Sequence, residues 1–99
     1  MDIIKSQKGK SVTFQVSGRL DTTTSPQLET AVNEVIEEVR DLILDFEKLE
    51  YISSAGLRLL LSTQKKLKGS SRMTLINVSS DIMEVFDLTG FSDLLKIIS

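Results

Sequence analysis

The sequence contains no cysteine and no histidine among its 99 residues. Without cysteine there is no disulfide framework, no thiolate metal site and no cysteine nucleophile. Without histidine, the commonest general base of nucleophilic enzymes is also missing. We therefore expect no metal site, no cofactor and no active site of the Ser-His or Cys-His type. The lack of cysteine also fits a reducing, cytoplasmic compartment.

Long apolar runs and a large charge excess are missing too. The longest apolar stretches have three residues, as in 42–44 and 59–61, so no segment is predicted to span a bilayer or to act as a secretory signal. The net charge is −2, and one Tyr and four Phe offer little stacking surface. Nucleic-acid binding normally needs a basic surface or stacking aromatic side chains. We expect a cytoplasmic protein with neither a nucleic-acid nor a membrane partner.

The composition that remains is that of an ordinary globular domain. Hydrophobic residues make up 40% of the chain and charged residues 26%, which is close to the average of folded domains. A chain of this length can bury one core. We expect one domain over residues 1–99.

The charges are unevenly distributed along the chain. Residues 29–50 contain eight acidic and two basic side chains, whereas residues 58–72 contain five basic and no acidic ones. One interpretation is two solvated surfaces of opposite charge. The alternative is a polarised surface that steers a partner protein.

Apolar periodicity predicts alternating strands and helices. Strands are expected at 2–7, 11–18, 41–46, 73–77 and 94–98, with Gly18 ending the second one and a loop at 47–52. Helices are expected from Ser25 to near Arg40, from 54 to 68 with Gly69 as the stop, and from Ser79 or Ser80 to Gly90. One of the hydroxyl residues 22–25, first of all Ser25, is expected to cap the first helix, and Pro26 suits its first position.

The order β-β-α-β-α-β-α-β predicts an α/β domain. It implies a mixed, mostly parallel sheet with an antiparallel edge strand from the N-terminal hairpin and with helices packed on the sheet. The polar side chains of Thr13 and Gln15 indicate that part of one sheet face is uncovered. In such folds, ligands bind beside the loops at the carboxyl ends of the strands, here 18–25, 47–54 and 78–80.

The most unusual local sequence lies in residues 51–57, where Ser53 and Ser54 precede Ala55 and Gly56 at a helix start. A helix N-terminus favours an anion, including a phosphate carried by Ser54 itself, and small residues permit close approach of another backbone. The alternative is that Ser53 only caps the helix and that Ala55 and Gly56 only pack.

Signatures of common enzymes are missing from the chain. There is no Gly-x-Ser-x-Gly elbow, no P-loop and no Gly-x-Gly-x-x-Gly fingerprint. The acids Asp21, Asp45 and Glu47 match no metal-binding loop, and we interpret them as solvated caps at strand ends.

Three segments together resemble STAS domains, in particular the bacterial anti-sigma factor antagonists. The segment 45–61 resembles the family signature, Gly18-Arg-Leu-Asp21 resembles its Gly-x-Leu-Asp element, and 85–91 resembles the end of its third helix. The three segments occur in the expected order, and the resemblance covers nearly the whole chain.

The resemblance implies a regulator without enzymatic activity. The unphosphorylated antagonist binds an anti-sigma factor, itself a Ser/Thr kinase, and so frees a sigma factor; a metal-dependent phosphatase reverses the phosphorylation. The family's Asp-Ser-x-Gly pattern falls on Ser53, Ser54 and Gly56, which implies Ser54 as the phospho-acceptor and places Ser53 where the family has Asp.

We predict that the partner surface is the rim formed by the two loops after neighbouring strands. Its residues are Asp21, Thr22, Thr23, Ser53, Ser54, Ala55, Gly56 and Arg58. Two alternatives stay open. One is a STAS scaffold or partner-switch module that regulates a non-sigma output without phosphorylation. The other is a nucleotide-binding domain, against which the missing phosphate loop argues.

Overall fold

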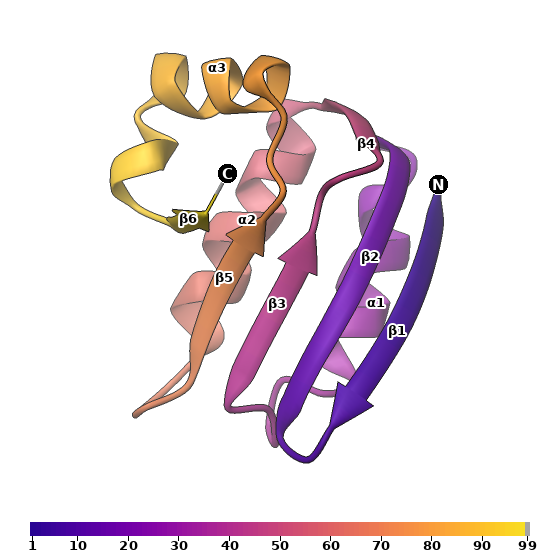
Figure 1. Ribbon diagram of the computed structural model, residues 1–99, viewed down its shortest axis with the longest axis vertical. Helices are drawn as coiled ribbons and strands as arrows, with labels where there is room; N and C mark the ends of the chain where they lie inside the picture. The colour runs from indigo at the N-terminus through magenta and orange to yellow at the C-terminus, as the bar shows by residue number, and fades with distance from the viewer. Residues whose placement is uncertain (99) are drawn as a thin grey trace.

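The computed structural model describes residues 1–98 (Figure 1). The expected order of strands and helices is confirmed, with one further strand, β4, and a short 3₁₀ helix, η1. The elements are β1 (Asp2–Lys8), β2 (Ser11–Leu20), α1 (Ser25–Asn33), β3 (Asp41–Asp45), β4 (Leu49–Ile52), α2 (Ser54–Lys66), β5 (Arg72–Ile76), α3 (Ser80–Thr89), η1 (Phe91–Asp93) and β6 (Lys96–Ile98). None of the helices in residues 1–98 is long and apolar enough to cross a membrane.

The strands form one mixed sheet in the order β1-β2-β3-β5-β6, with β4 paired to the far end of β2. β1 runs antiparallel to β2, and the other pairings are parallel. Gly9 makes the hairpin turn with a φ of +61°, a conformation that glycine adopts without steric cost. The predicted mostly parallel sheet with an antiparallel edge strand is confirmed.

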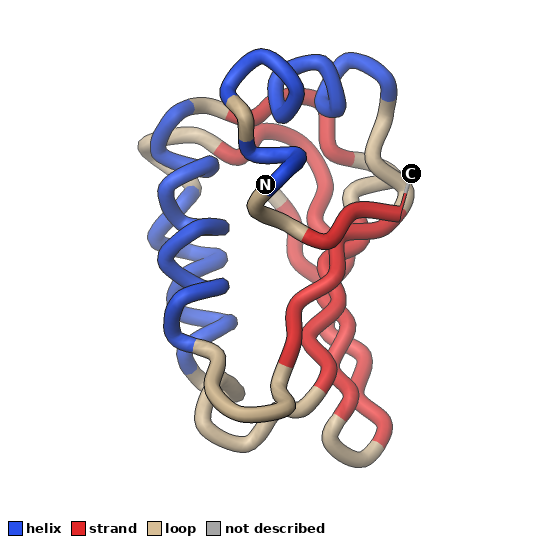
Figure 2. The backbone as a smooth tube through the Cα atoms, turned by 90° about the vertical axis from the view of Figure 1, so that its left-hand side faces the viewer, coloured by secondary structure: helices blue, strands red, loops and turns tan. Residues whose placement is uncertain are grey.

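Helices α1 and α2 cover one face of the sheet, and α3 lies across the end of the sheet near β4 (Figures 1 and 2). The opposite face is uncovered, as Thr13 and Gln15 predicted, and both of these side chains are half-buried. Alternate residues of the central strands point towards the helices and form the core. Its largest fully buried side chains include Phe14, Phe46, Phe86, Leu20, Leu28, Leu42, Leu44 and Leu60.

Helix α1 is shorter than its apolar stripe predicted, since it ends at Asn33 and not near Arg40. Val35 and Val39 are still buried, so the stripe continues while the backbone changes to tighter turns, such as the bond from Val35 N–H to the Val32 carbonyl at 3.0 Å. Acidic residues follow Asn33 and no basic residue lies in the last turn. Negative charge is unfavourable at a helix C-terminus, so these residues give the last turn of α1 no stabilising interaction with the helix dipole.

The predicted end of the second strand at Gly18 is wrong. β2 continues to Leu20 because Gly18 adopts a φ of +90°, and the register with β4 shifts between Gly18 and Arg19. The segment 47–52, expected to be a loop, contains β4 as the partner of this extension.

The predicted start and end of α3 are confirmed, whereas the predicted end of α2 is wrong. Ser79 caps α3, its hydroxyl accepting a hydrogen bond from Ile82 N–H at 3.2 Å, and Gly90 ends that helix in the left-handed conformation. Helix α2 ends earlier than expected, because Leu67 is already extended and Gly69 plays no part in the stop. The last strand begins at Lys96 because η1 occupies the preceding turn.

Candidate functional site

Two loops rich in hydroxyl groups leave the sheet side by side. Arg19 and Leu20 of β2 lie opposite Tyr51 and Ile52 of β4 in parallel register. The N–H of Ser53 then donates to the carbonyl of Leu20 at 2.9 Å. The segments 21–24 and 53–58 therefore start from adjacent strand ends, as the predicted partner rim requires.

The first loop is organised by the carboxylate of Asp21. One of its oxygens accepts hydrogen bonds from the N–H groups of Thr23 at 3.0 Å and Thr24 at 3.1 Å. The hydroxyl of Thr24 donates to the carbonyl of Arg19 at 2.7 Å. Thr22 and Thr23 are exposed. Asp21 thus shapes the loop, and the two threonines present its surface.

The N-cap of α1 is one of the hydroxyl residues before Pro26, as predicted, but it is not Ser25. Thr24 occupies the N-cap position, and Ser25 is already the first helical residue. The N–H groups before the helix are bound by Asp21 instead, and the Ser25 hydroxyl is buried without a hydrogen-bond partner among the described residues.

The same contacts hold the pKa of Asp21 below its ordinary value of 3.8. The N–H of Thr24 has the largest effect, and its hydroxyl, the N–H of Thr23 and the Arg19 guanidinium act in the same direction, while partial burial opposes them. Hydrogen bonds and positive charge favour the ionised carboxylate. The loop is therefore built around a charged Asp21.

Arg19 and Tyr51 form a contact that the sequence did not indicate. The Arg19 guanidinium carbon lies 4.1 Å from the centre of the Tyr51 ring, and its Nε lies 3.6 Å from the Asp21 carboxylate. A guanidinium over an aromatic face is a stabilising cation–π arrangement. Only the pairing of β2 with β4 brings these residues together, so no local sequence signal could have shown the contact.

The adjacent serines Ser53 and Ser54 have different surroundings. Ser53 occupies the N-cap position of α2, but its hydroxyl is buried and makes no hydrogen bond within the described residues. The interpretation of Ser53 as a side-chain cap is therefore wrong. Ser54 is the first residue of α2 and is exposed, so a modifying enzyme or a partner can reach its hydroxyl.

Gly56 faces into the molecule and not towards a partner. A Cβ at this position would lie 2.8 Å from Cγ1 of Ile52, 2.9 Å from Cγ of Leu20 and 3.0 Å from the Leu20 carbonyl oxygen. The close approach predicted for a partner backbone is thus made within the domain. Gly56 is buried and serves packing within the domain.

A groove of about 290 Å³ lies between the first turns of α1 and α2, next to Thr22 of the first loop. Ala55 and Leu59 line its α2 side, and Pro26 lines its α1 side. Glu29 and Arg58 lie on opposite walls and are both exposed. The rim therefore continues into a groove whose lining combines apolar and hydroxyl side chains with one acidic and one basic residue.

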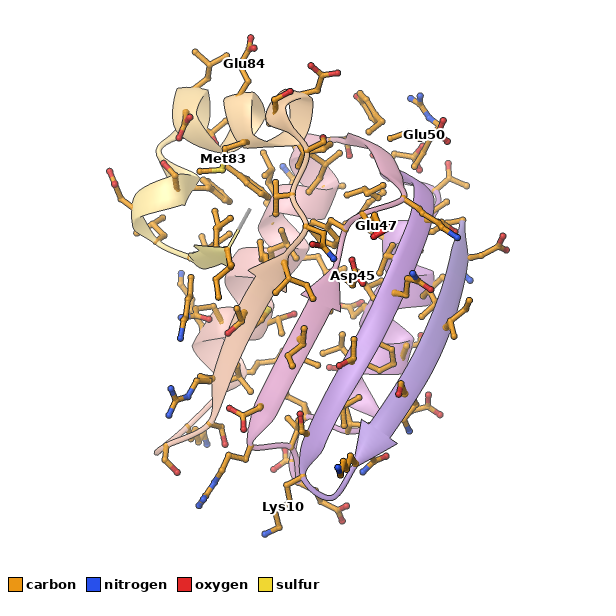
Figure 3. All side chains as sticks on the ribbon, viewed as in Figure 1. Lys10, Asp45, Glu47, Glu50, Met83 and Glu84 are labelled. Atoms are coloured by element: carbon orange, nitrogen blue, oxygen red, sulfur yellow. The ribbon has the colours of Figure 1, made fainter. Side chains whose placement is uncertain are left out.

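Of the two remaining acids, Asp45 makes loop contacts through its carboxylate, whereas Glu47 contributes only its main-chain N–H. Figure 3 shows Asp45 and Glu47 near the end of β3. One oxygen of Asp45 accepts hydrogen bonds from the Glu47 N–H and from Nδ2 of Asn77, both at 3.0 Å. Within residues 1–98, no three His, Cys, Asp or Glu side chains are grouped to hold a metal ion.

Comparison with known proteins gives consistent results. A family model for the STAS domain matches residues 2–99. The anti-sigma-B factor antagonist of Staphylococcus aureus is 29% identical over 99 residues, which cover 98% of this chain and 92% of that protein.

Two solved structures have the same fold. An anti-sigma factor antagonist from Mycobacterium paratuberculosis superposes with a TM-score of 0.89 at 23% identity, over 98% of this chain and 84% of that chain. The Bacillus cell fate determinant SpoIIAA in its phosphorylated form gives a TM-score of 0.76 at 22% identity, over 99% and 92% of the two chains.

The packing at Gly56 predicts a loss of stability on substitution. Gly56→Val should lower the free energy of unfolding by about 1–3 kcal/mol, since the added methyl groups collide with Leu20 and Ile52. Ala55→Val, on the same helix turn but at the groove, should cost less than about 1 kcal/mol. Urea denaturation measures both, and equal losses would contradict the packing role.

The lowered pKa of Asp21 predicts a pH-dependent contribution to stability. This contribution is complete above the ordinary value of 3.8 and is lost as the pH falls through the lower value of the folded state. Asp21→Asn should therefore melt below the wild type at neutral pH, and the two melting temperatures should converge in acid. Asp2→Asn, at an exposed position on β1, is the matched control. A difference for Asp21→Asn that persists unchanged to about pH 2 would contradict the charge effect.

Proposed function

The chain belongs to the STAS domain family, and we propose that it is an anti-sigma factor antagonist that acts by binding and not by catalysis. Its curated relative from Staphylococcus aureus carries that function in its name and is matched over nearly its whole length. In this proposal the chain works in the cytoplasm, binds an anti-sigma factor and so releases a sigma factor.

The exposure of Ser54 at the start of α2 is the observation that carries the proposal. Its hydroxyl lies on the rim that also presents Thr22 and Thr23, while the neighbouring Ser53 hydroxyl is buried. Of the two adjacent serines at the start of α2, Ser54 is therefore the one whose hydroxyl a kinase can reach. We propose that the anti-sigma factor, acting as a Ser/Thr kinase, phosphorylates Ser54 and that a metal-dependent phosphatase removes the phosphate.

Phosphorylation would act at the interface and leave the fold intact. A phosphate adds about −1.5 to −2 charges at pH 7, and at the first residue of α2 it faces free N–H groups and the positive end of the helix dipole. In a complex, the same charge must be desolvated or must meet partner groups, which costs several kcal/mol when it is not compensated. The solved phosphorylated form of SpoIIAA, which shares the fold, is consistent with this proposal.

A second function is favoured by one departure from the family pattern. Ser53 stands where the family has Asp, so one negative charge beside the acceptor is missing. A STAS scaffold or partner-switch module that binds its partner without phosphorylation, and regulates an output other than a sigma factor, would not need that charge. The mass of the intact chain after incubation with the kinase and ATP distinguishes the two functions.

Variants of Ser54 test the switch. Ser54→Ala should fold, bind the anti-sigma factor and resist the kinase. Ser54→Asp should bind more weakly, but by less than the loss of about 30- to 150-fold expected for phosphorylation. Ser53→Ala is the matched control and should be phosphorylated normally, since its hydroxyl makes no hydrogen bond. Stoichiometric phosphorylation of Ser54→Ala would show that the acceptor is another residue.

The docking rim is tested at an exposed threonine that takes no part in shaping the loop. Thr22→Lys places a long charged side chain beside the groove and should weaken binding by about tenfold or more without changing the melting temperature. Ser6→Lys introduces the same side chain at an exposed position of β1, away from the rim, and should bind normally. Calorimetric affinities that are equal for both variants would argue against the rim as the interface.

A further inference from the structure

Arg58 lies one helical turn after Ser54 on α2, and both side chains are exposed. Residues four apart on a helix are neighbours, with about 5–6 Å between their Cβ atoms. Helical side chains lean towards the N-terminus, so a side chain as long as that of Arg58 can reach a group carried by Ser54. An acid at position i with a base at i+4 is also the more favourable orientation for an ion pair.

Arg58 forms no ion pair with any residue of the described part of the chain, 1–98. The two ion pairs among the described residues, Arg19–Asp21 and Arg72–Asp41, do not involve it. Glu29 lies on the opposite wall of the groove without forming an ion pair with it. The guanidinium is therefore available to whatever contacts the rim.

Arg58 also joins two parts of the surface. It lines the groove between α1 and α2, and it begins a second hollow along the outer side of α2 that includes Leu61 and Lys65. No acidic residue occurs in 58–72. A partner that covers this positive surface would need to present carboxylate groups, since these form charge-assisted and often bidentate bonds with arginine.

We propose that Arg58 transmits the state of Ser54 to the partner, and this inference rests on the proposed function. In the unmodified chain, Arg58 binds a carboxylate of the anti-sigma factor. When Ser54 carries a phosphate, the guanidinium pairs with that phosphate across one helical turn. Phosphorylation then weakens the complex through two effects. It adds a negative charge opposite the partner's carboxylate, and it engages the arginine that had bound this carboxylate.

The pair within the chain can be tested without any partner. Phosphoserine is placed at position 54 of the full chain during synthesis, and the second phosphate ionisation is followed by ³¹P NMR. The pKa of the phosphate should be lower by about 0.2–0.4 in the wild-type background than in Arg58→Gln. Lys68→Gln, which removes the same charge from an exposed position beyond α2, should match the wild type. Equal values in Arg58→Gln and wild type would overturn the pair.

The link to the partner is tested by a double-mutant cycle on binding of the anti-sigma factor. Arg58→Gln should weaken binding of the unmodified chain about tenfold. Phosphoserine at position 54 should then lower the affinity of both proteins for the anti-sigma factor. The fold-loss should be about ten times smaller in Arg58→Gln than in the wild type, because the arginine contact is already lost. Equal factors in both backgrounds would overturn the coupling.

The two failures are distinguishable. A wild-type chain that binds no anti-sigma factor would refute the proposed function and the partner half of this inference together. Normal binding and switching with an unchanged phosphate titration in Arg58→Gln would refute the inference alone. Arg58→Lys retains the charge but not the bidentate geometry, so it should recover most of the pKa difference and only part of the affinity.

Discussion

The pairing of the last residues of β2 with β4 determines where the whole candidate site lies. Gly18 turns the strand with a positive φ, and the next two residues run beside β4. The hydrogen bond from Ser53 to Leu20 and the packing of Gly56 on Leu20 and Ile52 then fix the first turn of α2 against that strand pair. Without this pairing, the two hydroxyl-rich loops would have no fixed relation to each other.

A rigid platform of this kind suits regulation by a surface modification. The inner side of the first α2 turn is held by close apolar packing, and the outer side presents an exposed hydroxyl. Adding a charge to the outer side changes the surface without removing any of the contacts that fix the helix. The neighbouring Ser53 hydroxyl is buried and has no hydrogen-bond partner within residues 1–98, so Ser54 is the serine of this pair that a surface modification can reach.

Local patterns predicted the parts of the fold that depend on nearby residues. The order of elements, the Ser79 cap and the Gly90 stop follow from periodicity and capping chemistry within a few residues. The errors occurred where distant segments decide the outcome. β4 has only four residues and exists as the partner of the β2 extension. The inward direction of Gly56 depends on the side chain of Leu20, which lies 36 positions earlier in the sequence.

The uneven charge distribution has two separable consequences at this site. Arg58 lies about 5–6 Å from Ser54 between Cβ atoms, which is shorter than the Debye length of about 8 Å at physiological ionic strength. Its interaction with a charge at Ser54 is therefore only partly screened. Lys65 lies 11 residues after Ser54 on α2, a rise of about 16 Å along the helix axis. Salt therefore largely screens Lys65 from a charge at Ser54. In the proposed switch, the distant lysine would steer an acidic partner in either state of Ser54, whereas the arginine one turn away would respond to which state is present.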